Sequence, residues 1–166
     1  NQIESVDPDR WTITAQAGVT IEAVQNAAKA VNRVFAPDWG ARGTASVGGG
    51  IATDAGGNNV VRYGNMRDNV MGIEAVLADG TIWDGRRALV KDSSGYDLKH
   101  LFIGGEGTLG IVTSAVLKLR PATPYETSLL AAITGLEALA PLLDLAQQHA
   151  PGTVTAFELM PLVAID

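Results

Sequence analysis

Glycine is concentrated in the middle of this chain. Of its 19 glycines, 16 lie from Gly40 to Gly110, and the densest run is ASVGGGIATDAGGNN at 45–59. Glycine weakens regular helices and strands, but without a Cβ it lets the backbone turn tightly and approach another group closely. Main-chain N–H groups exposed in this way most often bind phosphate. The glycine distribution therefore predicts a ligand-binding backbone in this part of the chain.

The composition excludes several classes of protein. A net charge of −6 argues against nucleic-acid binding, because a surface that follows phosphates needs clustered Lys and Arg. No stretch approaches ~18 apolar residues without a polar interruption, so no transmembrane segment is predicted. The absence of cysteine excludes disulfides and thiolate chemistry. We expect a cytoplasmic protein, and a chain cut at both ends, since it opens on Asn1 and stops at Asp166.

The charges are unevenly distributed along the chain. All 12 Lys and Arg occur at or before Arg120, whereas the residues from Pro121 onward include five acids and no base. Pro121 and Pro124 flank this change. A chain of 166 residues supports one domain and part of another. We therefore expect one domain over 1–122 and the beginning of a second over 123–166.

Apolar periodicity predicts strands and one short helix in the first part of the chain. Trp11–Ala17 and Leu109–Leu119 alternate as strands do. An Asp-Gly turn between Val70–Ala78 and Thr81–Trp83 predicts a hairpin. Tyr96–Phe102 is compatible with a short helix.

Helical periodicity is clearest in two other places. Thr20 is a candidate N-cap for a helix over Ile21–Val31. In the acidic tail, residues 136–149 have the pattern of an amphipathic helix, with strands predicted at 128–133 and 154–159. The tail is thus expected to begin a β-α-β arrangement.

Two glycine motifs have alternative interpretations. Gly105–Gly110 matches the G-x-G-x-x-G pattern of dinucleotide-binding proteins, but that motif needs a following helix, and the next residues alternate as a strand. The run at 45–59 lacks the Lys-Ser/Thr pair of a P-loop. Gly48–Gly50 could open a helix whose free N–H groups face an anion, or could form a structural turn.

Few side chains suggest catalytic chemistry. His100 follows Asp97 by three positions, which is typical of a surface pair. His149 ends a predicted helix just before Pro151, where a cation suits the helix dipole. No metal-ligand spacing is present, so no metal site is predicted. From the residues alone, the chain is a glycine-lined cradle for an anion or cofactor with no acid, base or metal set of its own.

Five motifs occur in order along the chain. They are Pro37-Asp38, ASVGGGIATDAGG (45–57), RYGNMRDNVMGIEAVLADGTI (62–82), KDSSGYDLKHLFIGGEGTLGIVT (91–113) and FELM (157–160). Taken together, they resemble the FAD-linked oxidases of the vanillyl-alcohol oxidase superfamily, and the block at 91–113 is the most specific part. Within that superfamily, the similarity is greatest to the branch of D-2-hydroxyglutarate, D-lactate and glycolate dehydrogenases.

The resemblance implies an α+β fold with the second lobe of a PCMH-type FAD-binding domain over 1–122. It is followed by the start of the C-terminal FAD-linked oxidase cap domain over 123–166. The first lobe is then expected before Asn1, and the catalytic base and metal ligands beyond Asp166.

The implied enzyme oxidises a D-2-hydroxyacid to the 2-oxoacid by hydride transfer to FAD. Its electron acceptor would be a quinone, a cytochrome or an electron-transfer flavoprotein. Two alternatives remain open, a non-redox flavin enzyme of the ether-lipid synthase type and a cofactor-binding fragment without activity of its own.

The resemblance also implies which residues contact FAD. Those expected at the flavin or ribityl side are Pro37, Asp38, Gly40, Thr44, Ala45 and Ser46. Those expected to give close backbone approach to the phosphates and ring are Gly48, Gly49, Thr53, Ala55 and Gly56, with Tyr63 and Gly64 closing that edge. Those expected at the adenosine end are Glu106, Gly110, Ile111 and Val112. Asp54 is a departure, because relatives usually have Asn there, and an added negative charge facing the flavin would disfavour its anionic reduced form.

Overall fold

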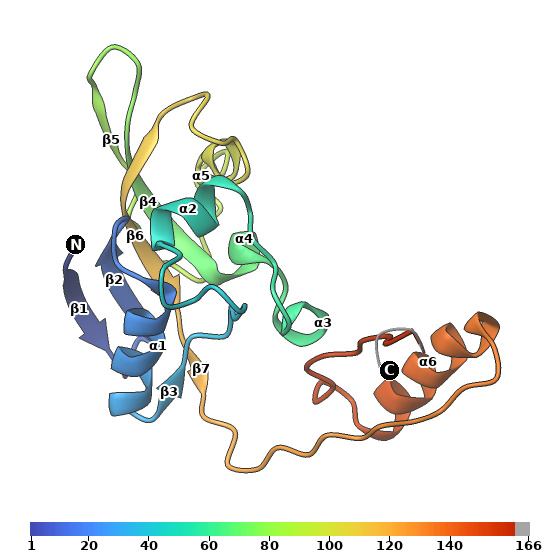
Figure 1. The fold of residues 1–166 in the computed structure, drawn as a ribbon. Helices are drawn as coiled ribbons and strands as arrows, with labels where there is room; N and C mark the ends of the chain where they lie inside the picture. Colours follow the sequence, from blue (N-terminus) through green and yellow to red (C-terminus); the bar gives the residue numbers. More distant parts are fainter. Residues whose placement is uncertain (162–166) are drawn as a thin grey trace.

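An antiparallel sheet organises the first 121 residues, here called the sheet lobe (Figure 1). The computed structural model describes residues 1–161, and the main sheet has five strands in the order β1-β2-β6-β4-β5, each antiparallel to its neighbours. These strands are β1 (Ile3–Asp7), β2 (Thr12–Gln16), β4 (Val70–Val76), β5 (Ile82–Asp84) and β6 (Ile111–Lys118). A second sheet pairs β3 (Arg33–Val34) with β7 (Arg120–Pro121).

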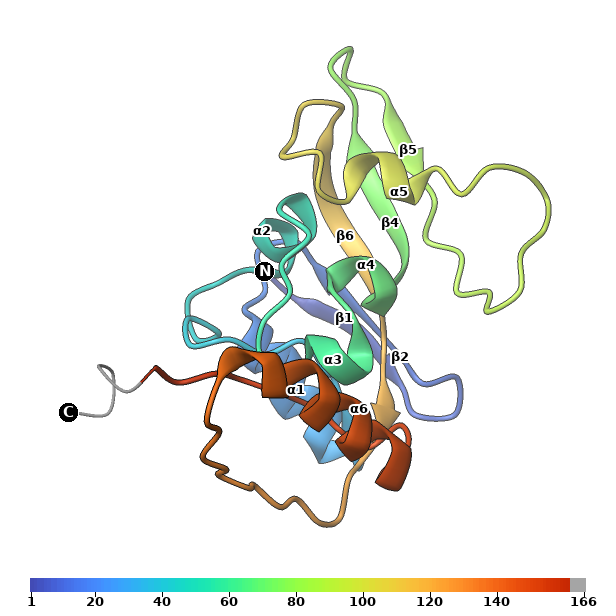
Figure 2. The same ribbon diagram turned by 90° about the vertical axis from the view of Figure 1, so that its right-hand side faces the viewer.

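Helices cover one face of the main sheet, as Figures 1 and 2 show from two directions. They are α1 (Ile21–Ala30), α2 (Val47–Ala52), α4 (Met66–Asn69) and α5 (Lys99–Phe102), with α3 (Val60–Tyr63) lying between α2 and α4 in the sequence. The mixture of an antiparallel sheet and packed helices is the α+β fold that was expected.

The hydrophobic core fills the space between the sheet and these helices. Ile13 of β2, Ile73 of β4 and Leu117 of β6 are fully buried in one cluster with Val24 of α1 and Ile51 of α2. Burial of one such side chain stabilises the fold by about 1.5–3 kcal/mol. The sheet and its helices therefore form one packed unit.

The predicted helix after Thr20 is confirmed. The Thr20 hydroxyl accepts a hydrogen bond from the Ala23 N–H at 3.2 Å, and the core-facing residues Ile21, Val24 and Ala28 are buried. The predicted hairpin corresponds to β4 and β5. Strand β6 directly follows the G-x-G-x-x-G match, so the NAD-type interpretation of that match is excluded by the local structure.

The opposite face of the sheet carries a polar cluster centred on Arg86. Glu74 points to this face because the preceding residue, Ile73, belongs to the core. The Arg86 guanidinium contacts the carboxylates of Glu4 at 3.5 Å, Glu74 at 3.0 Å and Asp84 at 2.9 Å. Its hydrogen bond to Asp84, followed by the charges of Glu74 and Glu4, raises the pKa of Arg86, and the same hydrogen bond lowers the pKa of Asp84 to about 2.

The C-terminal segment, residues 122–161, differs from the expectation. It contains a 3₁₀ turn at Leu136–Ala138 and α6 (Leu139–His149), which confirms the predicted helix. The strands predicted at 128–133 and 154–159 are wrong, since neither stretch is a strand in the structure. A strand needs a neighbour for its hydrogen bonds and a surface for its apolar face. Neither is provided in the described part of the segment, where Leu129 is 92% exposed.

Within residues 1–161, no helix combines the length and the apolar character that a membrane span requires.

Candidate functional site

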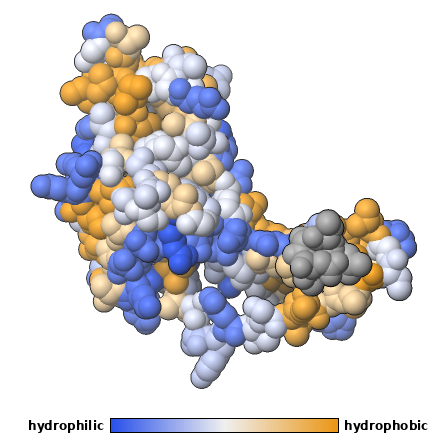
Figure 3. All heavy atoms as spheres, in the orientation of Figure 1, coloured by the Kyte–Doolittle hydropathy of each residue, from blue (hydrophilic) through white to orange (hydrophobic). Residues whose placement is uncertain are grey.

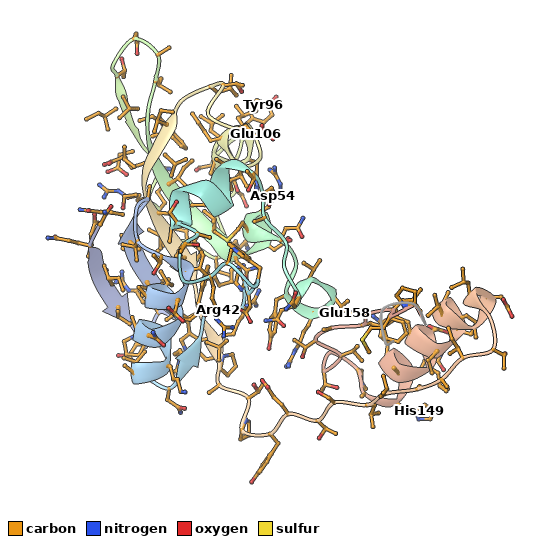
Figure 4. The ribbon with its side chains drawn as sticks, viewed as in Figure 1. Arg42, Asp54, Tyr96, Glu106, His149 and Glu158 are labelled. Carbon is orange, nitrogen blue, oxygen red and sulfur yellow. The ribbon has the colours of Figure 1, made fainter. Side chains whose placement is uncertain are left out.

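Helix α2 is the point at which the two glycine-rich segments meet. The Gly104 N–H donates to the Ile51 carbonyl at 3.0 Å, and the Glu106 N–H donates to the Ala52 carbonyl at 2.9 Å. Figure 4 shows Asp54 and Glu106 on the same flank of the sheet lobe. Segments that lie far apart in the sequence therefore form one surface around the C-terminal end of α2.

The loop that enters α2 is tied to its surroundings through the backbone. The Ile21 N–H donates to the Ala45 carbonyl at 3.0 Å, and the Asn58 N–H donates to the Asp38 carbonyl at 2.8 Å. Ser46 is the N-cap of α2. The loop contains six of the expected site residues, namely Pro37, Asp38, Gly40, Thr44, Ala45 and Ser46.

The first N–H groups of α2 are not free, which corrects the expectation of an anion site at this helix start. The Val47 N–H donates to the Val19 carbonyl at 2.8 Å, and the Gly48 N–H donates to the Ala17 carbonyl at 2.7 Å. The Gly49 N–H donates to the Ser46 hydroxyl at 3.1 Å. Because these donors are satisfied by the protein itself, the helix start has little left to offer a phosphate.

The glycines at the site differ in what a Cβ at each position would contact. A Cβ on Gly48 would lie 2.7 Å from the Ala17 Cβ, and one on Gly56 would lie 2.9 Å from Val60, so both permit close internal packing. A Cβ on Gly49 would lie 3.2 Å from the Ser46 hydroxyl, which is tighter than an ordinary contact, whereas one on Gly40 would meet nothing within 4 Å. Gly40 therefore leaves room for an external group.

Two acidic residues near α2 are each paired with an arginine. The Arg42 guanidinium contacts Asp38 at 2.9 Å, and this hydrogen bond raises the pKa of Arg42. The Arg67 side chain contacts Asp54 at 3.1 Å. Both guanidinium charges are thus compensated within the lobe.

The negative charge of Asp54, which stands where Asn was expected, is paired with Arg67. The Arg67 main-chain N–H donates to Asp54 Oδ1 at 2.9 Å, and the Arg67 Nε donates to Asp54 Oδ2 at 3.1 Å. The Arg67 guanidinium also donates to the carbonyl of His100, at 2.9 Å, and to the carbonyl of Ile103. Arg67 therefore neutralises Asp54 and fastens the 103–107 turn to α2. The only indication of this pairing in the sequence was indirect, namely an acid at position 54 in place of an amide.

The expected surface pair at α5 is confirmed. The His100 Nε2 lies 3.3 Å from Asp97 Oδ2, and both side chains are exposed. Within residues 1–161, no three carboxylate or imidazole side chains gather as metal ligands.

The remaining expected residues are placed less uniformly. Thr53 and Glu106 are exposed at the end of α2, and Ala55 is half-buried, its carbonyl accepting from the Met66 N–H at 3.0 Å. Gly110 adjoins β6, in which Ile111 is 63% exposed. Val112 is half-buried and packs against the core, which is compatible with the main-chain contact expected at this end of the cofactor.

Tyr63 and Gly64 lie apart from α2, at the end of α3. Gly64 has φ 72°, a conformation that favours glycine, and the guanidinium carbons of Arg62 and Arg120 lie 4.9 Å and 5.8 Å from the centre of the Tyr63 ring. The expected contact of Tyr63 and Gly64 with FAD stays a prediction.

Comparisons with known proteins agree with this architecture. Residues 1–86 match the family model described as "FAD binding domain". The chain is 48% identical over 128 residues to D-2-hydroxyglutarate dehydrogenase of Xanthomonas citri pv. viticola, covering 77% of this chain and 27% of the relative. It is 38% identical over 161 residues to a putative mitochondrial D-lactate dehydrogenase of Schizosaccharomyces pombe, covering 96% of this chain and 30% of the relative.

A solved structure of alkyldihydroxyacetonephosphate synthase matches with a TM-score of 0.63 at 26% identity, over 73% of this chain and 21% of that chain. The fold and site thus define a flavin-binding α+β lobe. The chain belongs to the FAD binding domain family, and FAD is the cofactor that this membership supports. It spans less than a third of the length of the curated relatives described above, at 27% and 30%.

The surface at α2 fits FAD through its rings and hydroxyls better than through its phosphates. Gly40 leaves space against which a ring or ribityl chain can lie. The exposed Glu106 carboxylate can accept hydrogen bonds from ribose hydroxyls. Because Arg42 and Arg67 are already paired, the lobe supplies no spare cation here for a pyrophosphate.

Proposed function

We propose that this chain is the second lobe of the FAD-binding domain, with the start of the cap domain, of a flavin-dependent dehydrogenase. The enzyme would oxidise a D-2-hydroxyacid to the corresponding 2-oxoacid. The observation that carries the proposal is the 48% identity to a D-2-hydroxyglutarate dehydrogenase over 128 residues, which is 77% of this chain. The boundary near residue 122 is part of the proposal.

The residues of this lobe would hold FAD, which would supply the acceptor for a hydride from the carbon that bears the substrate hydroxyl. The work of this chain is to position that cofactor. Gly40 leaves space for close contact, and the Glu106 carboxylate would accept hydrogen bonds from ribose hydroxyls. The other proposed contacts are Pro37, Asp38, Thr44, Ala45, Ser46, Gly48, Gly49, Thr53, Ala55, Gly56, Tyr63, Gly64, Gly110, Ile111 and the main chain of Val112. The general base and any metal would come from outside this chain.

The substrate is proposed to be a small-molecule 2-hydroxyacid, and the electron acceptor a quinone, a cytochrome or an electron-transfer flavoprotein. A cytoplasmic location also remains a proposal, because relatives from Bos taurus and Schizosaccharomyces pombe are named as mitochondrial proteins.

The proposal is tested with the full-length protein, purified with its flavin and supplied with D-2-hydroxyacids and an artificial dye acceptor. Dye reduction that depends on the D-isomer is expected. A protein that contains flavin but reduces no dye with any D-2-hydroxyacid would contradict the dehydrogenase proposal. That result would favour group exchange of the kind suggested by the likeness to alkyldihydroxyacetonephosphate synthase.

A further inference from the structure

The imidazole of His100, on α5, lies between a carboxylate and a guanidinium. Its Nε2 lies 3.3 Å from Asp97 Oδ2, and its Nδ1 lies 3.3 Å from Arg67 Nη1. An arginine side chain can only donate hydrogen bonds, so Nδ1 must accept from Arg67. The ring proton then belongs on Nε2, where it is donated to Asp97. The geometry therefore requires the neutral imidazole with its proton on Nε2.

The guanidinium that this imidazole contacts also fastens the 103–107 turn. Arg67 donates to the His100 carbonyl at 2.9 Å and to the Ile103 carbonyl. Its Nε donates to Asp54 Oδ2 at 3.1 Å. The imidazole and the carbonyl of His100 share Arg67 Nη1, so each of the two hydrogens on this nitrogen has an acceptor. The neutral ring therefore helps to fix the orientation in which Arg67 holds the turn.

The turn held by Arg67 has a backbone that depends on such contacts. Glu106 has φ 49°, in the left-handed region that residues other than glycine seldom adopt, between Gly104 at 79° and Gly107 at 78°. Asp54, which Arg67 also contacts, has φ 50°. Such conformations cost free energy and persist where the surrounding structure holds them. The position of the Glu106 carboxylate thus depends on how firmly Arg67 holds the turn.

Charged groups face the imidazole from both sides. Arg67 of α4 faces Nδ1, with Asp54 behind it, after the end of α2. Asp97 faces Nε2 and is itself contacted by the Lys99 ammonium. The His100 side chain is 40% exposed, and hydrophilic residues lie on the surface of this lobe (Figure 3), so water can deliver a proton to the ring.

A proton added to Nδ1 would act on the Arg67 side of the ring. It would remove the acceptor for Arg67 Nη1 and place a second positive charge 3.3 Å from it. The contact with Asp97 would survive, because Nε2 carries a proton in both forms of the ring. Protonation of His100 therefore weakens the hold on the guanidinium and leaves the hold on Asp97 in place.

We propose that His100 is a positioning residue for the cofactor-binding surface. As the neutral imidazole it orients Arg67, which holds the 103–107 turn against α2, and as the imidazolium it loosens that hold. An imidazole changes charge between about pH 5 and pH 8, so the attachment of the turn weakens as the pH falls through this range. The inference rests on the proposed function only in that Glu106 serves the cofactor there.

The test is amide hydrogen exchange of this chain without flavin, recorded by NMR at about pH 7.5 and about pH 5.5 and corrected for the intrinsic exchange rate. The Gly104 and Glu106 N–H groups donate to carbonyls of α2. We expect both to lose about threefold in protection at the lower pH, as befits repulsion between two partly exposed charges. The Val24 N–H, which donates to the Thr20 carbonyl at 3.2 Å in α1, is the internal reference and should keep its protection.

His100→Gln and His100→Lys separate the charge of the ring from its bulk. Glutamine offers Arg67 an uncharged acceptor at both pH values, so protection of the turn should no longer depend on pH. Lysine carries a positive charge at both, so protection should be low at both. His149→Gln is the matched control, because His149 is the other histidine of the chain and lies at the end of α6, and its pH response should equal that of the wild type.

Equal protection of Gly104 and Glu106 at the two pH values in the wild type, a result that does not depend on any variant folding, would overturn the proposal. A pH response that persists in His100→Gln would overturn it as well. Because neither flavin nor turnover is involved, these outcomes are independent of dye reduction by the full-length enzyme.

Discussion

Replacing Arg67 by alanine tests how strongly the surface at α2 depends on the pairing with Asp54. The substitution removes the hydrogen bonds of the Arg67 side chain to Asp54 at 3.1 Å and to the His100 carbonyl at 2.9 Å, and the one to the Ile103 carbonyl. A hydrogen bond to a charged group contributes about 1.5–3 kcal/mol when buried and less when exposed. Since the Arg67 side chain is 36% exposed, we expect a loss of about 2 kcal/mol in the free energy of unfolding.

Asp54→Asn is the matched variant. In the wild type the Arg67 main-chain N–H donates to Asp54 Oδ1 at 2.9 Å, and the amide oxygen of asparagine can still accept this hydrogen bond. It should cost about 0.5–1 kcal/mol. The double variant then gives the coupling energy between the two side chains, expected to be about 1 kcal/mol. Both are measured by urea unfolding, followed by circular dichroism and tryptophan fluorescence.

Amide hydrogen exchange gives a local measurement. The Gly104 and Glu106 N–H groups that donate to α2 should exchange faster in Arg67→Ala, because the turn that carries them loses its attachment. An unfolding free energy within about 0.5 kcal/mol of the wild type, with unchanged protection at both amides, would refute the role assigned to Arg67.

Further predictions follow from the packing and the ionisable groups. Gly48→Ala should lower the free energy of unfolding by about 1–3 kcal/mol, because the new Cβ would lie 2.7 Å from Ala17, whereas Gly40→Ala should change it little. Equal urea midpoints for the two variants would contradict this. The pKa of Asp84 is lowered from 3.8 to about 2, so its ion pair with Arg86 stabilises the fold above pH 4, and this contribution is lost as the pH falls toward 2. Asp84→Asn should flatten that part of the stability profile, and an unchanged profile between pH 4 and pH 2 would count against it. The purified chain should be colourless or weakly flavinated, and a stoichiometric flavin spectrum would show that one lobe suffices.

Much of the fold was predictable because local signals and tertiary structure agree. Thr20 caps the helix it was expected to cap, and alternation placed β2, β4 and β6. Strand β1 was not predicted, since Ile3–Asp7 is a half-exposed edge strand with little alternation. The four-residue helices α3 and α4 are too short to show a period.

The strands predicted in the C-terminal segment were wrong because the local signal and the tertiary structure disagree there. Residues 128–133 have strand-like composition, but β-structure depends on a partner as well as on propensity, and Leu129 and Leu130 remain 92% and 84% exposed.

The candidate site was predictable in position but not in its bonding. The glycine-rich segments identified the residues that surround α2, because glycine marks close backbone approach. Nothing in the sequence indicated that the carbonyls of Val19 and Ala17 would take up the first N–H groups of α2, since these are tertiary contacts. Arg67 was missed for the same reason. Its partners Asp54 and Ile103 are 13 and 36 residues away.

The N–H groups at the start of α2 are hydrogen-bonded within the protein, so this helix start does not depend on the cofactor in order to fold. A surface whose N–H groups waited for phosphate would carry an energetic cost until the cofactor arrived, and folding would depend on flavin supply. Here Val47 and Gly48 are already bonded to Val19 and Ala17, and Gly49 to Ser46. The start of α2 can therefore form before flavin arrives, and flavin binding need not be coupled to the folding of this helix start.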